Sequence, residues 1–286
     1  MAARGEALGV DGVVQLPAGP LRYWDRGEGS PVVFVHGLLV NADLWRHVLP
    51  VVAEAGHRCL APDWPLGAHE LPMPAADLTP PGLASMIASF LEELDLRDAT
   101  IVANDTGGAL TQILLANHPE RVGRVVLTSS DSFERFFPPV FAFLPWLARV
   151  PGAVTVLSQV LRLRALHRLP FTFGWVSKRP IPREYVDSYL GPSRRDAAVR
   201  RDLARFLRGV HRRHTMAAAE RLPAFDRPVL LAWAEEDRLF PLSLAHRLAE
   251  VLPNARVVAI ADSYTFVPED QPQVLADLIV AELRSA

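Results

Sequence analysis

The ten residues IVANDTGGAL, Ile101 to Leu110, hold a charged side chain at a turn where a reactive group would be exposed. An apolar run ends in Asn104, Asp105 and Thr106, and two glycines then lead into a helical pattern. A strand, a sharp turn and a helix commonly present a nucleophile. An aspartate needs no base to activate it, since its unperturbed pKa of about 3.9 leaves it ionised at neutral pH. We therefore predict that Asp105 attacks an electrophilic carbon and forms an ester; the alternative is that it only caps the helix.

Two backbone N–H groups are predicted to stabilise negative charge on an oxygen at this turn. Thr106 directly follows Asp105, and Leu38 follows the HG of an earlier apolar run, PVVFVHG. In a strand–turn–helix site, the N–H after the nucleophile and one from an earlier loop form an oxyanion hole. Small residues are needed beside the turn because the backbones crowd there. Ala103 and the Gly107–Gly108 pair meet that need.

Alternating strands and helices must bring these residues to one edge of a sheet. Short apolar runs alternate with amphipathic patterns of helical period on both sides of Asp105. Such alternation predicts an α/β fold, with a mostly parallel sheet covered by helices on both faces. The predicted strands are 31–37, 57–63, 99–105, 123–130, 227–237 and 255–263, and the predicted helices are 42–56, 78–96, 106–122, 242–253 and 272–284.

The alternation stops between residues 132 and 221. This stretch carries aromatic residues, prolines and helical patterns, and it contains no clear strand pattern. We expect it to form a helical cap inserted into the fold. Residues 1–131 and 222–286 would then form the core domain, and residues 132–221 the cap domain.

Composition limits the classes of partner. The net charge is −2 and the pI is about 6.5, which argues against nucleic acid as the main partner. Cys59 is the only cysteine, so no intramolecular disulfide is possible. The N-terminus lacks the apolar run of a signal peptide, and prolines interrupt the apolar stretch 133–163. We expect a cytoplasmic protein that binds an apolar small molecule, with no nucleic-acid or membrane partner, no cofactor and no metal.

The chain resembles the α/β-hydrolase fold superfamily from about Val13 to Leu283. Its aspartate turn, NDTGG, is similar to that of the epoxide hydrolase and haloalkane dehalogenase branch, and further segments follow in that family's order: PVVFVHG, APDWPLG, NHPERVGRVVLT, RPVLLAWAEEDRLFP and VPEDQP. The resemblance implies an eight-stranded, mostly parallel sheet whose cap shapes the substrate pocket. It also implies hydrolysis of an epoxide, an ester or a carbon–halogen bond through an ester on Asp105.

The resemblance implies a histidine, oriented by an acid, that activates water to break this ester. Asp237, after PVLLAWAEE, and Asp131, after VVLTSS, are both candidates for the acid. Thr265, in the segment DSYTFVPEDQP, occupies the place of the histidine, and no histidine follows His246. Loss of such a base can cost on the order of 10⁶ in rate. Two alternatives therefore stay open: a non-hydrolytic isomerase, lyase or cyclase using Asp105 as acid or base, and a binder without chemistry.

Other histidines and the cap aromatics are candidates for the remaining roles. His36, His69, His211 and His214 are the histidines that could replace the missing base. Tyr185 and Tyr189 lie one helical turn apart, and the resemblance implies that cap tyrosines bind the oxygen of an epoxide. The residues expected to contact substrate are His36, Trp45, Tyr185, Tyr189 and Thr265. Eight cap aromatics either line an apolar pocket or pack the cap: Phe136, Phe137, Phe141, Phe143, Trp146, Phe171, Phe173 and Trp175.

Overall fold

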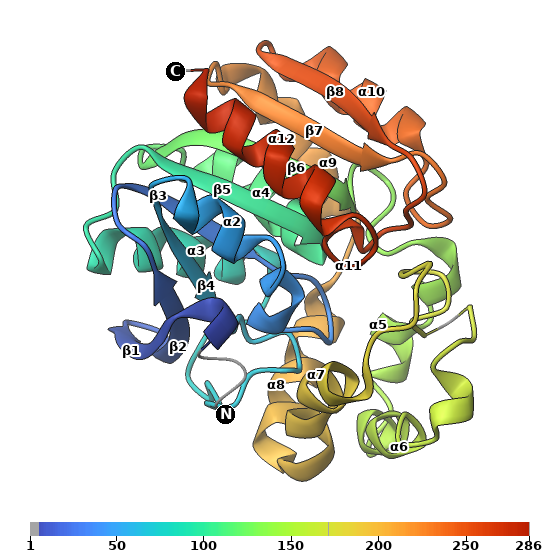
Figure 1. Cartoon of the computed structure of the whole chain (residues 1–286). Coiled ribbons are helices and arrows are strands. Elements are labelled where there is room, and N and C mark those ends of the chain that lie inside the picture. The colour runs from blue at the N-terminus through green and yellow to red at the C-terminus, as the bar shows by residue number, and fades with distance from the viewer. Residues whose placement is uncertain (1–5, 171, 286) are drawn as a thin grey trace.

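The computed structural model describes residues 6–170 and 172–285, and it contains an eight-stranded sheet. The strand order is β1-β2-β4-β3-β5-β6-β7-β8 (Figure 1). The β1–β2 and β2–β4 pairs are antiparallel, and all other pairs are parallel. The strands are β1 (Val10–Leu16), β2 (Gly19–Arg26), β3 (Ser30–Val35), β4 (His57–Pro62), β5 (Ala99–Asp105), β6 (Val122–Ser130), β7 (Val229–Ala234) and β8 (Ala255–Ile260). The predicted α/β class and the eight-stranded, mostly parallel sheet are confirmed.

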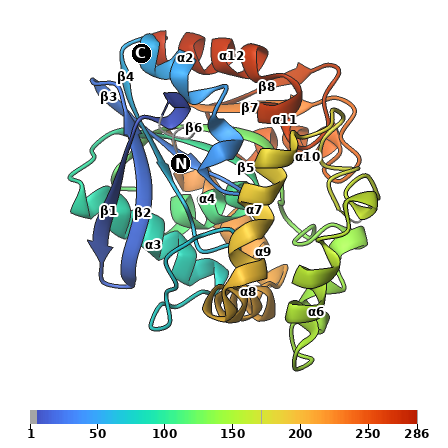
Figure 2. The same cartoon turned by 60° about the horizontal axis from the view of Figure 1, so that its bottom comes forward.

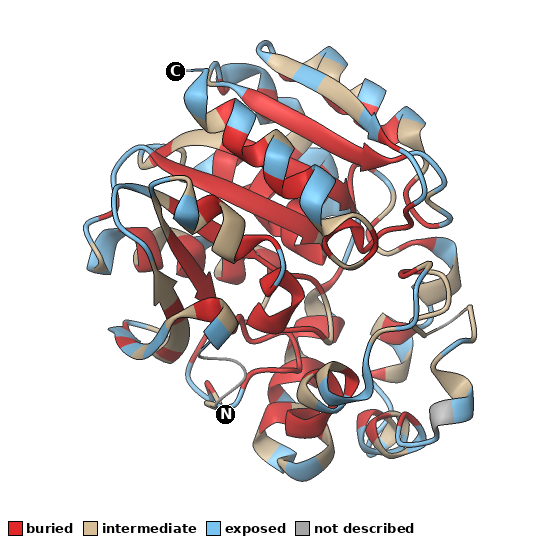
Figure 3. Ribbon diagram, viewed as in Figure 1, coloured by how far each residue is buried: buried red, intermediate tan, exposed pale blue. Residues whose placement is uncertain are grey.

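Helices cover both faces of the sheet, so its central strands are buried on both sides. Helices α2 and α12 lie on one face, and α3, α4, α9 and α10 lie on the other (Figures 1 and 2). Strand β7 is buried along its whole length, and β5 everywhere except its last residue (Figure 3). The core helices are α2 (Leu49–Glu54), α3 (Pro80–Glu93), α4 (Thr106–Asn117), α9 (Arg213–Arg221), α10 (Leu242–Val251), α11 (Val267–Asp270) and α12 (Pro272–Arg284).

Two local details differ from the prediction. The helix expected over residues 42–56 is split into a 3₁₀ turn, η1 (Ala42–Trp45), and α2. The side chain of Asn41 caps η1 by accepting from the N–H of Asp43, and Pro50 starts the second helix in the first-turn position that proline favours. The sequence pattern does not predict the antiparallel strands β1 and β2; in β2 only Leu21 and Trp24 are buried and the other residues are half-buried, so the strand lacks the alternation that marks a strand in a sequence.

The inserted segment between β6 and β7 is helical. Its elements are η2 (Pro139–Phe141), α5 (Leu144–Leu147), α6 (Ala153–Val160), η3 (Arg164–Leu166), α7 (Arg183–Arg195) and α8 (Ala197–Gly209). Figure 1 shows them below the carboxyl ends of the parallel strands, with α6 farthest from the sheet. Helix α9, which the prediction assigned to the cap, packs against α4 of the core. A last 3₁₀ turn, η4 (Leu222–Ala224), leads back into the sheet.

Candidate active site

Asp105 stands at a strained turn between β5 and α4. Its backbone has φ of 55° and ψ of −130°, a conformation that residues other than glycine rarely adopt. Its side chain makes no capping hydrogen bond to α4, although it occupies the position before the helix. Strain at a turn of this kind is a feature of functional sites. The alternative that Asp105 only caps its helix is therefore not supported by the geometry.

Glycines allow the backbone to close around this turn. A Cβ atom added to Gly37 would lie 2.1 Å from Oδ2 of Asp105. Added to Gly107, it would lie 2.3 Å from the backbone carbonyl of Val35 in β3, and added to Gly108, 2.3 Å from a side-chain atom of β6. Contacts this short do not occur, so any larger residue would displace the carboxylate or separate the helix from the sheet. The predicted crowding at the turn is thus present.

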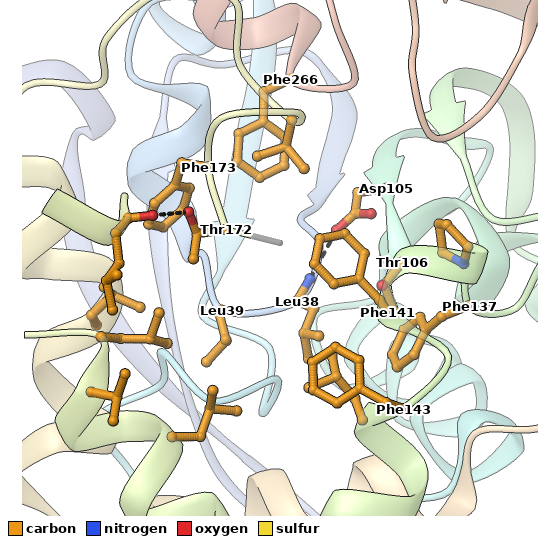
Figure 4. Close-up of a pocket in the computed structure, with 18 residues that line it drawn as sticks. Leu38, Leu39, Asp105, Thr106, Phe137, Phe141, Phe143, Thr172, Phe173 and Phe266 are labelled. Atoms are coloured by element: carbon orange, nitrogen blue, oxygen red, sulfur yellow. Dashed lines mark hydrogen bonds between the residues drawn. The ribbon is translucent and has the colours of Figure 1, made fainter. Parts of the chain in front are cut away.

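One oxygen of the Asp105 carboxylate is held by a backbone donor. The N–H of Leu38 donates to Oδ2 at 3.2 Å, and the N–H of Thr106 also lowers the pKa of this group by hydrogen bonding (Figure 4). Leu38 and Thr106 are the two residues predicted to form the oxyanion hole. In an ester of Asp105, the held oxygen would be the carbonyl oxygen, which becomes negative when water attacks.

Three carboxyl groups lie close enough to influence one another. Burial raises the pKa of Asp105 to about 7; the hydrogen bonds from Thr106 and Leu38 oppose that rise, and the charge of Asp237 adds to it. Asp131 also interacts electrostatically with Asp105. The structure therefore brings together all three aspartates that the sequence singled out. Carboxylates that are close together in a desolvated site oppose one another's ionisation. The three carboxyl groups are therefore only partly ionised at neutral pH.

Asp131 faces the nucleophile side of this group. It is completely buried at the end of β6, and the hydroxyl of Thr106 donates to its Oδ2 at 3.2 Å. Its Oδ1 is buried without a hydrogen-bond partner among the described residues. Burial, followed by the charge of Asp105, raises its pKa well above the ordinary range. Burial and the neighbouring charge of Asp105 therefore both favour the neutral form of the Asp131 carboxyl group.

Asp237 faces the position where the family's histidine would stand. The hydroxyl of Thr265 donates to its Oδ1 at 2.9 Å, and the N–H groups of Leu239 and Phe240 donate to the same oxygen at 2.7 and 2.9 Å. Burial raises its pKa to about 6 against these hydrogen bonds. Thr265 is completely buried, and its hydroxyl makes a hydrogen bond to Asp237 at the position where the resemblance implies a histidine. Of the two candidate acids, Asp237 is the one paired with this position.

Asn104, a residue that the sequence interpretation left without a role, ties the two halves of the site together. Its Nδ2 donates to the backbone carbonyl of Thr265 at 2.7 Å and to the hydroxyl of Thr128 at 2.7 Å. Asn104 is completely buried next to Asp105. The loop of Thr265 is thereby fixed beside the turn. The sequence signal for Asn104 is its polar side chain directly before Asp105, at the end of a largely apolar strand.

A largely apolar cavity opens in front of Asp105. It encloses about 920 Å³, part of which is open to solvent, and lies between the core and the cap (Figure 4). Among the wall residues that the structure describes, Asp105 is the one ionisable residue, and the hydroxyl of Thr172 donates to backbone carbonyls. The remaining wall is nearly all hydrocarbon: Leu38, Leu39, Phe137, Pro138, Phe141, Phe143, Leu144, Leu157, Val160, Leu161, Leu166, Phe173, Val176, Leu190 and Phe266.

The eight cap aromatics divide between this wall and other places. Phe137, Phe141, Phe143 and Phe173 line the cavity. Phe136 is buried, and Trp146 is 70% exposed. Trp175 packs against the core, and Phe171 lies outside the described residues.

None of the residues expected to contact substrate is among the described residues that line the cavity. His36 is completely buried; its Nε2 accepts from the N–H of Trp64 at 2.9 Å, so its Nδ1 carries the proton and donates to the carbonyl of Gly37 at 2.9 Å. Trp45 is also completely buried and packs against Phe34. Thr265 is buried beside Asp237. His36 thus supports the loop of the oxyanion hole.

The two cap tyrosines bind to the core. The hydroxyl of Tyr189 donates to Oε1 of Glu269 at 2.9 Å. Arg46 forms a bidentate pair with the same carboxylate at 2.6 and 2.7 Å, and its guanidinium lies 3.7 Å from the ring centre of Tyr185. Arg46, Tyr189 and Glu269 are nearly or fully inaccessible to solvent. This buried network fixes α7 to η1 and α11, and neither tyrosine is among the described residues of the cavity wall.

No histidine among the described wall residues of the cavity replaces the missing base. His69 is buried and lies 3.4 Å from Asp202 of α8, where it joins the core to the cap. His211 and His214 lie at the start of α9, close to the arginines of their own segment. Within the described chain, no group of three or more His, Cys, Asp or Glu residues could hold a metal. The helices described there include none long and apolar enough to cross a membrane.

The chain is similar in sequence and in fold to several known proteins. The uncharacterized hydrolase YugF of Bacillus subtilis is 27% identical over 259 residues, which are 87% of this chain and 88% of that protein. A cis-3-alkyl-4-alkyloxetan-2-one decarboxylase of Shewanella oneidensis is 26% identical over 261 residues, or 87% and 80% of the two chains. The haloalkane dehalogenase DatA of Agrobacterium tumefaciens has the same fold, with a TM-score of 0.80, 23% identity and 100% and 99% coverage.

The family model for the alpha/beta hydrolase fold matches residues 30–272. This range runs from β3, before the oxyanion loop, to the start of α12, and it includes the turn, both acids and the cap. The chain therefore belongs to the α/β hydrolase fold family.

Proposed function

We propose that this protein acts on a small apolar electrophile through Asp105 as the nucleophile. The observation that carries the proposal is the pose of the carboxylate: one oxygen is held by the Leu38 N–H, and the residue lies on the wall of a hydrocarbon cavity. A nearly apolar wall favours an apolar substrate, since a polar one would lose its hydrogen bonds with water without replacement. The suitable reactive groups are an epoxide, an ester or a carbon–halogen bond.

In the first step, the free oxygen of ionised Asp105 donates an electron pair to the electrophilic carbon. With an alkyl halide or an epoxide, the new carbon–oxygen bond forms an ester as the carbon–halogen or epoxide carbon–oxygen bond breaks. Halide leaves with its electron pair, whereas an epoxide oxygen keeps the pair and takes up a proton from water. With a carboxylic ester, attack at the carbonyl carbon expels the alkoxide or phenolate with its electron pair and leaves a mixed anhydride on Asp105. The hydrogen bond from Leu38 holds the carboxylate in one orientation.

The second step, attack of water on this ester, is expected to be slow. Thr265 is a hydroxyl that does not accept a proton near neutral pH, so it cannot do the work of histidine. Its partner Asp237 has a pKa of about 6, close to the ordinary value of histidine, and it is the group nearest this position that can take up a proton. We infer that the protein is a hydrolase whose ester intermediate accumulates.

Intact-mass measurement tests the proposal. The protein would be incubated with 1-bromohexane, 1,2-epoxydecane or 4-nitrophenyl butyrate, and any adduct located by peptide mapping. We expect one adduct per chain on the peptide containing Asp105, such as a hexyl group in place of one proton. The Asp105→Asn variant is the matched control and should stay unmodified. Absence of both adduct and turnover with all three probes would overturn the proposal.

A second candidate is a non-hydrolytic reaction in which Asp105 moves a proton. A pKa of about 7 suits a general acid or base at neutral pH, and such chemistry needs neither an ester nor a histidine. One relative is named as a decarboxylase of an alkylated four-membered lactone, so the family includes reactions other than hydrolysis. Turnover that is lost in Asp105→Asn, with no adduct at any time, would favour this candidate.

A further inference from the structure

The cap carries a strong excess of positive charge. Between Glu134 and Glu184, the 49 residues 135–183 include seven arginines and Lys178, and no Asp or Glu. The whole chain, in contrast, has a net charge of −2. A block of one sign within a nearly neutral protein indicates an interaction with a partner of the opposite charge.

The same part of the chain carries most of the exposed large hydrophobic side chains. Of the ten such residues among the described ones, six lie between residues 143 and 163. Their exposed fractions range from 41% to 70%, with Trp146 the highest. We call these six the docking face: Phe143, Trp146, Val150, Val156, Val160 and Leu163. A patch of exposed apolar side chains, unlike scattered single ones, marks an interaction site.

The docking face follows the helical turns of α5 and α6. Residues 143, 146 and 150 share one side of the first helical segment, and residues 156, 160 and 163 share one side of the second. The opposite sides pack inward, as the buried Leu144, Ala148 and Val154 show. In Figures 1 and 2, α6 lies at the periphery of the molecule, away from the sheet. Both segments thus carry apolar side chains on the side that faces solvent as well as on the side that packs inward.

The docking face is continuous with the mouth of the cavity. Phe143 and Val160 belong to the face and also line the cavity wall (Figure 4 labels Phe143). Phe143 comes from the start of α5, and Val160 from the end of α6. The two apolar sides therefore meet where the cavity opens.

Arginines surround this face. Arg149 stacks over the ring of Trp146 at 4.8 Å, and Arg162 follows α6. Arg201 and Arg208 of α8 share a groove with Val150. These four side chains are exposed, and within residues 6–170 and 172–285 none of them forms an ion pair with a carboxylate. An apolar centre with a basic rim matches the chemistry of an anionic lipid surface, where hydrocarbon lies beneath negatively charged headgroups.

We propose that the docking face binds the surface of a bilayer containing anionic lipid. A second copy of this chain is the less suitable occupant, because its own basic rim would repel the first. This interaction departs from the sequence expectation of no membrane partner, and it requires no spanning helix. If Asp105 also acts as proposed above, an apolar substrate dissolved in the bilayer could enter the cavity at Phe143 and Val160 without crossing water. The docking itself does not depend on that activity.

Co-sedimentation with vesicles tests the proposal. The full-length protein would be mixed with sucrose-loaded vesicles of phosphatidylcholine alone or with 30% phosphatidylglycerol. We expect binding to the anionic vesicles, weakened by added salt. Trp146→Glu should lower the partition coefficient at least tenfold, and Arg149→Ala about fivefold. Val274→Glu is the matched control: Val274 is 44% exposed on α12, so the same change there should leave binding unaltered.

A second readout separates docking from general stickiness. Lipids brominated in their acyl chains should quench tryptophan fluorescence of the wild type, and Trp146→Phe should remove most of this quenching while the variant still sediments. The proposal would be overturned if the wild type bound neutral and anionic vesicles equally, or if Trp146→Glu bound anionic vesicles as strongly as the wild type. Absence of binding by the wild type would also overturn it. A dimer in solution that Trp146→Glu dissociates, without vesicle binding, would assign the face to a second copy. Because these residues are exposed, the variants should fold, and circular dichroism checks this.

Discussion

The two sides of the site differ in completeness. On the side of Asp105, a strained turn, closely packed glycines and a backbone donor hold a carboxylate at the wall of an apolar cavity. On the side of Asp237, the acid is held by three hydrogen bonds, one of them from Thr265 where a histidine would be expected. Attack needs only the first side, whereas release of an ester needs both. In the proposed two-step reaction, the identity of residue 265 alone can therefore allow ester formation while slowing ester breakdown.

The largest effect is expected from removing the nucleophile. Asp105→Asn keeps the size of the side chain but cannot attack carbon, so adduct formation with 1-bromohexane should fall by about 10⁴ or more. Time-resolved intact mass measures this rate. Asp131→Asn is the control variant. Asp131 is not among the described residues of the cavity wall, so this variant should still form the adduct. If Asp105→Asn retained the wild-type rate, the nucleophile would have to be another residue.

Restoring a histidine should complete the weaker side. In Thr265→His, the imidazole would be oriented by Asp237 and could activate water, so breakdown of a preformed ester should accelerate by about 10²–10⁴. The decay of the adduct mass after removal of excess reagent gives the rate. Thr265→Gln, of similar size without a titratable group, should show no acceleration. An ester equally stable in both folded variants would mean that the histidine position is not all that is missing.

The pH dependence of ester formation tests the nucleophile directly. Only ionised Asp105 attacks, and burial raises its pKa to about 7. The rate should therefore rise with pH, about tenfold per unit below pH 6, and level off above about pH 8. A profile that is already flat at pH 5 would show that the carboxylate titrates at its ordinary pKa.

The same pKa affects stability with a defined sign. Because the folded-state pKa of Asp105 lies above the unfolded value, stability is highest below about pH 4 for this group and is lost as pH rises through about 7. Asp105→Asn removes that loss. It should raise the free energy of unfolding by about 4 kcal/mol at pH 8, and by about 1.5 kcal/mol at pH 5. Urea denaturation at the two pH values measures the difference; equal changes at both would contradict it.

The smallest effect is expected at the hydroxyl of Thr265. Thr265→Val keeps the shape but removes the hydrogen bond to Asp237, which should cost about 1–2 kcal/mol of stability. Residual ester breakdown should fall a fewfold while ester formation is unchanged. Comparing formation and breakdown in one variant shows which side of the site the residue serves. A fall in formation instead would place Thr265 on the side of Asp105.

Local pattern made the first side of the site predictable from the sequence. A strand, a charged turn and paired glycines identify Asp105, and the HG sequence identifies Leu38, because each signal lies within a few residues. Asp237 and Thr265 were found through resemblance to a family motif. The role of Tyr189 could not be predicted, because a buried pair of distant residues, Arg46 and Glu269, decides where its side chain lies. Such pairs leave no local period in the sequence.

The sequence pattern predicts a helical insertion, but it does not predict how the parts of this insertion pack on the core. Aromatic residues spread along the cap gave no indication of which side chains face the cavity, since that depends on how its short helices pack on the core. Phe136 and Phe137 are neighbours, yet only Phe137 is on the wall.

The buried network of Arg46, Glu269 and Tyr189 has a consequence for how this protein could change over time. It fastens α7 to the core at one end of the cap, whereas the opposite wall of the cavity comes from the short turns around α5 and α6. Substitutions in those turns can reshape the space in front of Asp105 while the network of Arg46, Glu269 and Tyr189 remains intact. One half of the cap therefore carries the stability of the attachment, and the other is free to diversify toward new substrates.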